Sequence, residues 1–341
     1  MNVDKADNRS TAVSAKAFVA FGELLLRLDA QAHERLVQAQ DFVVHYTGGE
    51  ANVAVALSQW GVQASVISRV PAHEIGQACV NYLRRYGVQT DGVVRGGERL
   101  GILYVEAGAA QRPSKVIYDR LNSSFRDIQQ GEVDWNDILR GKDWLHFTGT
   151  APALGRNVLS VLKDGLQTAK HLNVTVSFDC NYRSTLWGVE EARRVLKELT
   201  PYINVFIGTH YDAQALFDIN GNPDESAAQL QRQFGFRHVA YTLRENLSAS
   251  VNRFAGLLHD GKNCHASREY EMQIVDRIGG GDAFAAGLIY GLLQGWPTQR
   301  TVDFAAASGC LKHSIQGDFN LVSFDEVEQL VREGRSGRIQ R

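Results

Sequence analysis

The sequence is poor in the features that mark disulfide-bonded, metal-binding and nucleic-acid-binding proteins. Its 341 residues include four cysteines, none in C-x-x-C spacing and none clustered with histidine at metal-ligand spacing. We therefore predict core roles for the cysteines and a reducing, cytoplasmic location. The net charge is −2, so the chain has no bulk electrostatic attraction to nucleic acid or to a membrane surface.

Long apolar runs are also missing. The apolar stretch over residues 17–28 is interrupted by Gly22, Glu23 and Arg27, so it predicts a buried strand and its exit instead of a membrane span. The polar residues 1–16 lack the continuous apolar segment of a secretory signal, and we expect them to form a disordered tail. The sequence shows no internal repeat and no low-complexity tract.

What is present is an alternation of strand-like and helix-like segments. Alternation of this kind predicts an α/β fold, in which a doubly wound, mostly parallel sheet is covered by helices on both faces. Ligands of such sheets bind at the carboxyl ends of the strands. The predicted strands span residues 17–26, 64–70, 143–149, 173–181, 204–209 and 237–244, and the predicted helices span 48–61, 75–87, 155–172, 190–203, 227–235 and the segment after Gly281.

Two stretches interrupt this alternation, at about residues 29–47 and 91–127. Both contain strand-like segments and neither contains a helix of the usual length. We interpret them as strands of a smaller sheet outside the main one. A small sheet over the strand ends would act as a lid on the ligand site.

Three consecutive glycines, Gly279, Gly280 and Gly281, stand between a strand end and a helix. The first N–H groups of a helix have no intrahelical partner, and residues without a β-carbon let an anion approach them closely. Asp282 follows directly, where it could take a proton from an attacking hydroxyl. The competing interpretation is a flexible turn with Asp282 as a helix cap.

Two other glycine motifs do not fit this segment. A G-x-G-x-x-G fingerprint needs glycine where Phe284 stands, and G-x-x-x-x-G-K-[ST] has no match in the chain. A second pair, Gly48 and Gly49, precedes another helix rich in small residues, with Asn52 facing the same opening. A tight turn with close helix packing would explain this pair alone, but the two glycine sites together favour a phosphate-handling enzyme.

These two segments together resemble the signatures of the ribokinase-like (PfkB) family of carbohydrate kinases. Residues 48–61 resemble the N-terminal signature and residues 276–293 the C-terminal one, where the usual glycine pattern is G-A-G-D. The resemblance covers the chain from Phe18 to about Glu328. It implies one ribokinase-like α/β domain over residues 17–341 with a β-sheet lid, and ATP-dependent phosphorylation of an alcohol. It also implies Asp282 as the base and the backbone of Gly279, Gly280 and Gly281 as the anion hole.

The segment FDCNYRSTLW, at residues 178–187, is similar to the 2-keto-3-deoxygluconate kinase branch of that family. This similarity implies transfer of the γ-phosphate to the terminal, 6-hydroxyl group of 2-keto-3-deoxygluconate, giving 2-keto-3-deoxy-6-phosphogluconate. Phosphorylation of fructose, ribose, a nucleoside or the galactonate epimer is the alternative within the same chemistry. A catalytically inactive sugar-acid sensor is the alternative from another class.

A substrate carboxylate needs cations and hydrogen-bond donors around it. Arg183 follows a predicted strand at its carboxyl end, and we interpret it as a substrate contact. Arg27 fits a substrate contact and an ordinary ion pair equally well. Tyr118 and Arg120 share one face of a predicted lid strand, with Tyr104 on the probable partner strand. Gly48, Gly49 and Asn52 complete the predicted sugar site.

The nucleotide side departs from the family pattern. Where the family has N-x-x-E, this chain has Thr209 and Asp212, and we assign Asp212 to Mg²⁺ through water. In place of T-x-G-x-x-G the chain keeps Thr242 and carries Arg244. We expect Arg244 to pair with ATP phosphates, together with the backbone of Gly279 and Gly281; pairing with the lid or with neighbouring Glu245 is the alternative. Gly280 stands where the family usually has alanine, and we expect it to loosen the empty loop.

The family's lids often pair between subunits, so the resemblance also implies a homodimer joined through the lid. The predicted lid strands are amphipathic, and a partner would cover their outer face. The expected ligands are therefore ATP, Mg²⁺ and a small sugar acid, with no nucleic acid and no membrane.

Overall fold

The computed structural model of this chain describes residues 16–334, and the tail predicted for residues 1–16 lies outside that range except for Lys16. A twisted sheet runs through the described part, with strand order β13-β12-β11-β10-β9-β8-β1-β4-β5 and β14 beside β12. Pairing is parallel from β11 to β5, as predicted, whereas β12 is antiparallel to β11, β13 and β14. The strands are β1 (Ala17–Phe21), β4 (Gln63–Val70), β5 (Val93–Arg95), β8 (Trp144–Thr148), β9 (Thr175–Asp179), β10 (Val205–Gly208), β11 (His238–Asn246), β12 (Val251–His259), β13 (Cys264–Ala266) and β14 (Tyr270–Gln273).

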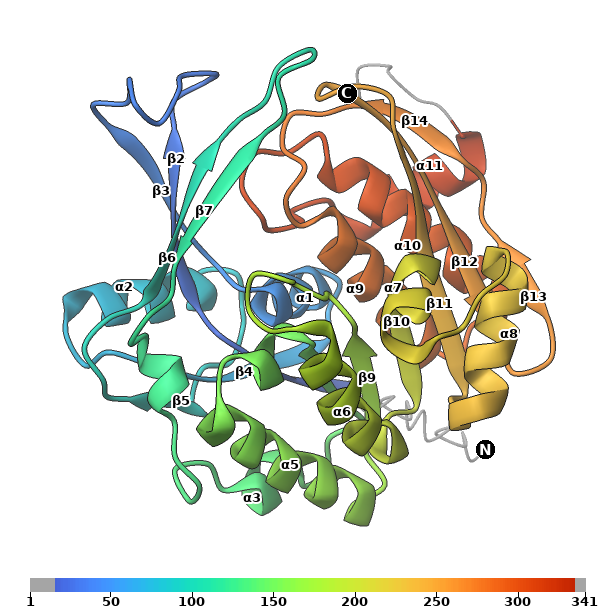
Figure 1. Cartoon of the computed structure of the whole chain (residues 1–341), viewed down its shortest axis with the longest axis horizontal. Helices are drawn as coiled ribbons and strands as arrows, with labels where there is room; N and C mark the ends of the chain where they lie inside the picture. The colour runs from blue at the N-terminus through green and yellow to red at the C-terminus, as the bar shows by residue number, and fades with distance from the viewer. Residues whose placement is uncertain (1–15, 335–341) are drawn as a thin grey trace, which may run out of the picture.

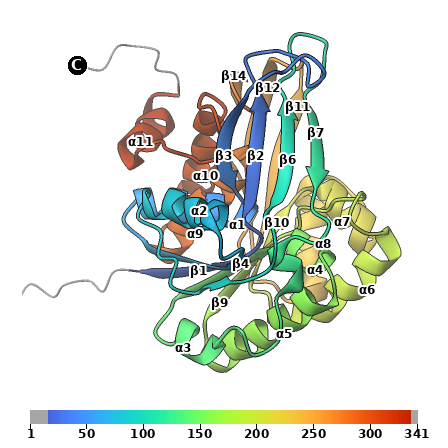
Figure 2. The ribbon, with the colours of Figure 1, turned by 90° about the vertical axis from the view of Figure 1, so that its left-hand side faces the viewer.

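Helices cover both faces of the sheet, and each face has its own apolar core (Figure 2). One face carries α1 (Gly49–Gln59), α2 (Glu74–Arg84), α9 (Gly280–Leu293), α10 (Thr298–Lys312) and α11 (Phe324–Glu333). The other carries α3 (Trp135–Leu139), α4 (Thr150–Ala153), α5 (Arg156–His171), α6 (Val189–Leu199), α7 (His210–Phe217) and α8 (Pro223–Phe234). The predicted doubly wound α/β fold is therefore confirmed.

Helix α9 explains why the glycine segment needs small residues. It is apolar on nearly all sides, and ten of its fourteen residues are buried, because it packs against α1 and α10 at once. A helix with no polar face is stable only when neighbours cover it all round. The first turn of α9 is thereby fixed at the carboxyl ends of the strands.

A second, smaller sheet stands away from this body and is called the lid below (Figure 1). Its strands are β2 (Leu25–Ala30), β3 (Phe42–Thr47), β6 (Gly101–Glu106) and β7 (Lys115–Asp119), in the order β3-β2-β6-β7. The pairs β2–β3 and β6–β7 are antiparallel, and β2 and β6 are parallel. The predicted small sheet over the strand ends is present.

The lid differs from its prediction at its boundaries. It begins at Leu25, earlier than residue 29, because the chain leaves the main sheet after Phe21 instead of continuing as one strand to Leu26. Gly22 marks the exit, where a β-carbon would lie 2.1 Å from Oε2 of Glu50. The predicted range 91–127 is also too wide, since β5 joins the main sheet and residues 124–127 form a 3₁₀ turn packed against α5 and β4.

The described cysteines are all free, two of them buried and two half-buried, which agrees with core roles. Among residues 16–334, no helix is both long enough and apolar enough to cross a membrane.

Candidate active site

A cavity of about 450 Å³ opens between the lid and the carboxyl ends of β9, β10 and β11. Most of the predicted site residues line it, although they come from segments far apart in the sequence. These are Gly48, Gly49, Asn52, Tyr118, Arg120, Arg183, Asp212, Thr242, Arg244, Gly279, Gly281 and Asp282. The structure therefore brings the two glycine sites and the predicted base to one place.

The first turn of α9 forms one wall of this cavity. Gly279 is its N-cap with φ 87°, and a β-carbon there would lie 2.1 Å from the backbone oxygen of Asp318, so only glycine fits. Gly281 has open space where a β-carbon would stand. No side chain caps the turn, and its N–H groups are available for an anion in the cavity.

Glycine stands at position 280 for a different reason, and the expectation that Gly280 loosens the loop is wrong. Gly280 does not line the cavity, and its φ is not in the left-handed region. A β-carbon there would lie 2.3 Å from Cε1 of buried His313. The missing side chain makes room for a ring, so this part of the turn is closely packed rather than loose.

Asp282 lies in the first turn of α9 and faces the cavity beside Gly49. Asn52 Nδ2 donates a hydrogen bond to its Oδ2 at 2.6 Å. Burial raises the pKa of Asp282 to about 6, although the Asn52 hydrogen bond lowers it. A carboxylate with this pKa is ionised near neutral pH and is a stronger base than an exposed aspartate.

Two arginines place positive charge in the cavity. Arg183 follows β9 and Arg244 lies on β11, and neither guanidinium group forms an ion pair or a hydrogen bond with another residue among residues 16–334. The Arg244 guanidinium carbon lies 5.3 Å from the ring centre of Phe254. Guanidinium groups in a cavity whose N–H groups have no hydrogen-bond acceptor favour anionic ligands.

The inner face of the lid supplies Val116, Tyr118 and Arg120, which alternate along β7 as predicted. The Arg120 guanidinium carbon lies 4.3 Å from the ring centre of Tyr118, and Arg120 Nε lies 3.4 Å from Oε2 of Glu23. Arg120 is therefore held in place before any ligand binds.

Tyr104 is not at the cavity. Leu103 pairs with Tyr118 across the β6–β7 ladder, so alternation turns Tyr104 to the outer face of the lid, where it contacts Phe42. The prediction picked the neighbour of the residue that lines the cavity, because the register between the two strands was unknown.

Arg27 is also absent from this cavity. Its side chain is 2% exposed, and it donates to Asp29 at 2.7 Å, to Asp276 at 2.5 Å and to Asp318. With its donors bound to three carboxylates, the guanidinium has no geometry left for a substrate carboxylate. Of its two interpretations, the structure favours the ion pair.

Thr209 and Asp212 form a capping box at the start of α7. The Thr209 hydroxyl accepts from Asp212 N, and Asp212 Oδ2 accepts from Thr209 N at 2.8 Å. This explains why threonine fits the position where the family has asparagine. One Asp212 oxygen is therefore used by the helix, and the residue still borders the cavity.

The sequence analysis missed three charged residues around the cavity. Asp179 ends β9 beside Asp212 and Asp282, and burial together with those two acids raises its pKa to about 8. Its place at a strand end was a usable signal. Arg277 lies within residues 276–293, next to the three glycines, and donates to Ala249 O at 3.1 Å. Asp318 is remote in sequence from every motif and gave no signal.

The acids around the cavity suit a hydrated cation better than a protein cage. Among residues 16–334, no group of three or more histidine, cysteine or acidic side chains is placed to hold a metal ion. Mg²⁺ commonly keeps several water molecules and binds one or two carboxylates together with substrate phosphates. Asp212 and Asp179 are the cavity carboxylates that fit this arrangement.

Comparisons with known proteins agree with this architecture. The model of the pfkB family carbohydrate kinases matches residues 15–320. A Haloferax volcanii 2-dehydro-3-deoxygalactonokinase is 32% identical over 319 residues, covering 94% of this chain and 98% of the relative. A Geobacillus thermodenitrificans 5-dehydro-2-deoxygluconokinase is 25% identical over 334 residues, covering 94% of each chain.

A solved structure is also closely similar. The crystal structure of a Thermotoga maritima 2-dehydro-3-deoxygluconokinase has a TM-score of 0.91 and 42% sequence identity, covering 93% of this chain and 98% of that one. These three proteins are all named as kinases of sugar acids, and the names differ in the sugar acid.

Proposed function

The chain belongs to the pfkB family of carbohydrate kinases, and from that premise we propose that it phosphorylates the terminal hydroxyl of 2-keto-3-deoxygluconate with ATP. The product of this reaction is 2-keto-3-deoxy-6-phosphogluconate. The single observation that carries the choice of an acidic sugar is the unpaired guanidinium of Arg183 in the same cavity as Asp282. A neutral sugar would leave that guanidinium without an anionic hydrogen-bond acceptor.

Each side chain has a part in this proposal. Asp282 accepts the proton of the terminal hydroxyl while the hydroxyl oxygen bonds to the transferred phosphorus and ADP leaves. The N–H groups of the first turn of α9 bind the phosphoryl oxygens. Arg183, with Arg120 and Tyr118 from the lid, binds the substrate carboxylate and orients the sugar, and Gly48, Gly49 and Asn52 border its hydroxyls.

ATP, when bound, supplies the phosphoryl group, and Mg²⁺ neutralises phosphate charge. Thr242, Arg244, Gly279 and Gly281 contact the phosphates, and Asp212, with Asp179 beside it, holds the water shell of Mg²⁺. We place the reaction in the cytoplasm, where ATP is supplied.

We also propose a homodimer through the outer face of the lid. Val44, Leu28, Tyr104 and Ile117 stand side by side across β3, β2, β6 and β7. Val44 is 51% exposed and Ile117 is 43% exposed. A second copy placed on this apolar face would remove it from water.

The substrate proposal is tested by ADP release on a panel of acceptors. The panel contains 2-keto-3-deoxygluconate, its galactonate epimer, 5-keto-2-deoxygluconate, fructose, ribose and a nucleoside. We expect the highest kcat/KM on 2-keto-3-deoxygluconate. Turnover of neutral sugars alone would overturn the substrate. Thermal stabilisation of the protein by a keto acid without any turnover would favour the alternative function, a catalytically inactive sugar-acid sensor.

A further inference from the structure

A continuous chain of hydrogen bonds joins the lid to Asp282. Arg27 Nη1 donates to Asp318 Oδ1, and the Thr47 hydroxyl donates to Asp318 Oδ2. The same hydroxyl lies 3.1 Å from Asn52 Oδ1, and Asn52 Nδ2 donates to Asp282 Oδ2 at 2.6 Å. Five side chains from β2, β3, α1, α9 and the segment after α10 are thus connected without a gap.

The chemistry of these groups fixes the direction of each bond. An ionised carboxylate only accepts, so the Asn52 amide must turn its NH₂ group to Asp282 and its oxygen to Thr47. Thr47 in turn has one proton, which it shares between the amide oxygen and Asp318. The Thr47 proton thus lies in a three-centre hydrogen bond, and Asp318 helps to hold the hydroxyl beside the amide oxygen of Asn52.

The result is a carboxylate held by one oxygen. Asn52 binds Oδ2 of Asp282, and Oδ1 is left on the side of Gly49, where a β-carbon would lie 3.8 Å away. Both Gly49 and Asp282 border the cavity. The free oxygen is therefore the one turned to where an acceptor hydroxyl would sit.

Burial protects the intermediate contacts from water. Arg27, Thr47, Asn52 and Asp318 are each at most 5% exposed. Hydrogen bonds in such an interior are stronger than in water, and replacing one partner leaves the other unsatisfied. Arg27 also neutralises Asp318, so the chain of contacts does not place an uncompensated charge behind Asp282.

We propose that Asp318 is a positioning residue for the base, acting through Thr47 and Asn52. The inference rests on the proposed function, in which Asp282 is the base. The chain of hydrogen bonds from Arg27 through Asp318, Thr47 and Asn52 to Asp282 is called the relay below. Arg27 lies on β2 and Thr47 ends β3, so two lid strands hold this relay. Placement of the lid and orientation of the base are thereby coupled.

The decisive variant is Thr47→Val, which keeps the shape of the side chain and the Arg27–Asp318 pair but cuts the relay. We expect kcat to fall on the order of tenfold with KM changed less than about twofold, because the base is still present but poorly aligned. The matched control is Thr301→Val, which deletes another buried hydroxyl, bonded to Pro297 O near the start of α10. A kcat for Thr47→Val equal to that of the control would overturn the relay.

Asp318→Asn measures how the charge of Asp318 acts on Asp282. It removes a negative charge near Asp282, so the acid limb of kcat should shift to lower pH. The charged groups around Asp282 that remain in this variant are Glu50, Asp179, Arg183, Arg244 and Lys312. Thr47→Val keeps these charges but loosens the Asn52 hydrogen bond that lowers the pKa of Asp282, so its acid limb should shift to higher pH. An acid limb of Thr47→Val at the wild-type pH would contradict the proposal.

The same variants separate this inference from the proposed function. If the wild type phosphorylates the keto acid and Thr47→Val does so equally well, the relay fails and the function stands. If the wild type phosphorylates no acceptor, the function fails, and the relay is tested by carboxyl NMR of Asp282. A higher titration midpoint of Asp282 in Thr47→Val, which keeps the charge of Asp318, supports the relay, and an unchanged midpoint overturns it.

Discussion

The His313 ring fills the space that a side chain on Gly280 would need at the start of α9, since a β-carbon on Gly280 would lie 2.3 Å from Cε1 of His313. The His313 ring cannot swing aside easily, because its Nδ1 lies 2.6 Å from Gly309 O and its face packs against Phe254. The glycine and the histidine thus form a matched pair that fixes the turn which borders the cavity.

We predict that Gly280→Ala destabilises the protein by about 1–3 kcal/mol, because an added methyl group in a packed site forces its neighbours to move. Thermal and urea unfolding measure this loss. Gly281→Ala is the matched control, since the same methyl group would enter open space there. Its free energy of unfolding should stay within about 0.5 kcal/mol of wild type, while its activity falls because the methyl group faces the cavity.

A double-mutant cycle identifies the contact responsible. In the double variant Gly280→Ala/His313→Ala the ring is gone, so the added methyl group no longer clashes with it. We expect a favourable interaction free energy of about 1 kcal/mol or more between the two changes. Additive losses would show that the clash is relieved elsewhere and that the two residues are not a pair.

The raised pKa of Asp282 predicts how activity depends on pH. The base acts when ionised, so kcat should rise through about pH 6 and level off above it. Asp282→Asn should lower kcat by about 10²–10⁴-fold, the usual contribution of a general base. ADP release measured from pH 5 to 8 gives both results, and near-normal turnover by the variant would exclude Asp282 as the base.

The free energy of unfolding should also depend on the ionisation of Asp282, but the ionised form that favours activity lowers stability. The pKa of Asp282 in the folded protein lies above its ordinary value of 3.8, so the folded state binds the proton more tightly. The free energy of unfolding therefore falls as pH rises from about 4 to 6 through this group. Asp282→Asn should accordingly melt at a higher temperature than wild type at pH 8, and this gain should vanish near pH 4.

The sequence predicted the layers of this fold well because they follow from periodicity. Alternating segments and buried apolar strands predict a parallel sheet between helices, and glycines before a helix predict an open first turn. The antiparallel strands β12, β13 and β14 were missed, since residues 251–273 interrupt the strand–helix alternation without a helix between them. Pattern arguments are weakest where the pattern changes.

Side-chain partners were harder to predict than elements. Tyr104 was misplaced because strand register decides which face a residue occupies, and one step reverses it. The ion pairs of Arg27 could not be recognised from the sequence, because its three acidic partners come from positions 29, 276 and 318. A substrate contact therefore remained open for it. No local pattern in the sequence joins those positions, so the relay behind the base became visible only in three dimensions.

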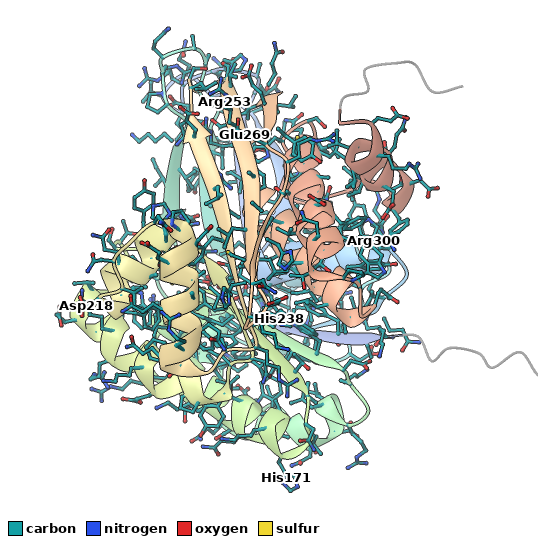
Figure 3. All side chains as sticks on the ribbon, turned by 90° about the vertical axis from the view of Figure 1, so that its right-hand side faces the viewer. His171, Asp218, His238, Arg253, Glu269 and Arg300 are labelled. Carbon is teal, nitrogen blue, oxygen red and sulfur yellow. The ribbon has the colours of Figure 1, made fainter. Side chains whose placement is uncertain are left out.

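Arg183 provides the sharpest test of an acidic substrate. Arg183→Gln should lower kcat/KM for the keto acid by about 10- to 100-fold, since a charge-assisted hydrogen bond contributes about 1.5–3 kcal/mol. Arg253→Gln is the matched control. Figure 3 shows Arg253 near Glu269 at the upper end of β12, where it also pairs with Glu245 and Glu271.

Both variants lose one positive charge, but only Arg183 lines the cavity. Equal losses in the two variants would mean that net charge, and not a contact, attracts the substrate. An unchanged kcat/KM in Arg183→Gln would remove this arginine from the substrate site and with it the main support for an acidic sugar.

The outer face of the lid yields the last prediction. Val44→Glu places a charge at the β3 end of the apolar row that includes Leu28 and Tyr104, so it should convert a dimer into a monomer. Light scattering during size-exclusion chromatography measures the mass directly. Val37→Glu is the control, since Val37 is 93% exposed and lies in the β2–β3 loop outside that row. It should keep the wild-type mass. A wild type that already elutes at the mass of one chain would show that this face has no partner copy, and the apolar row would then need another explanation.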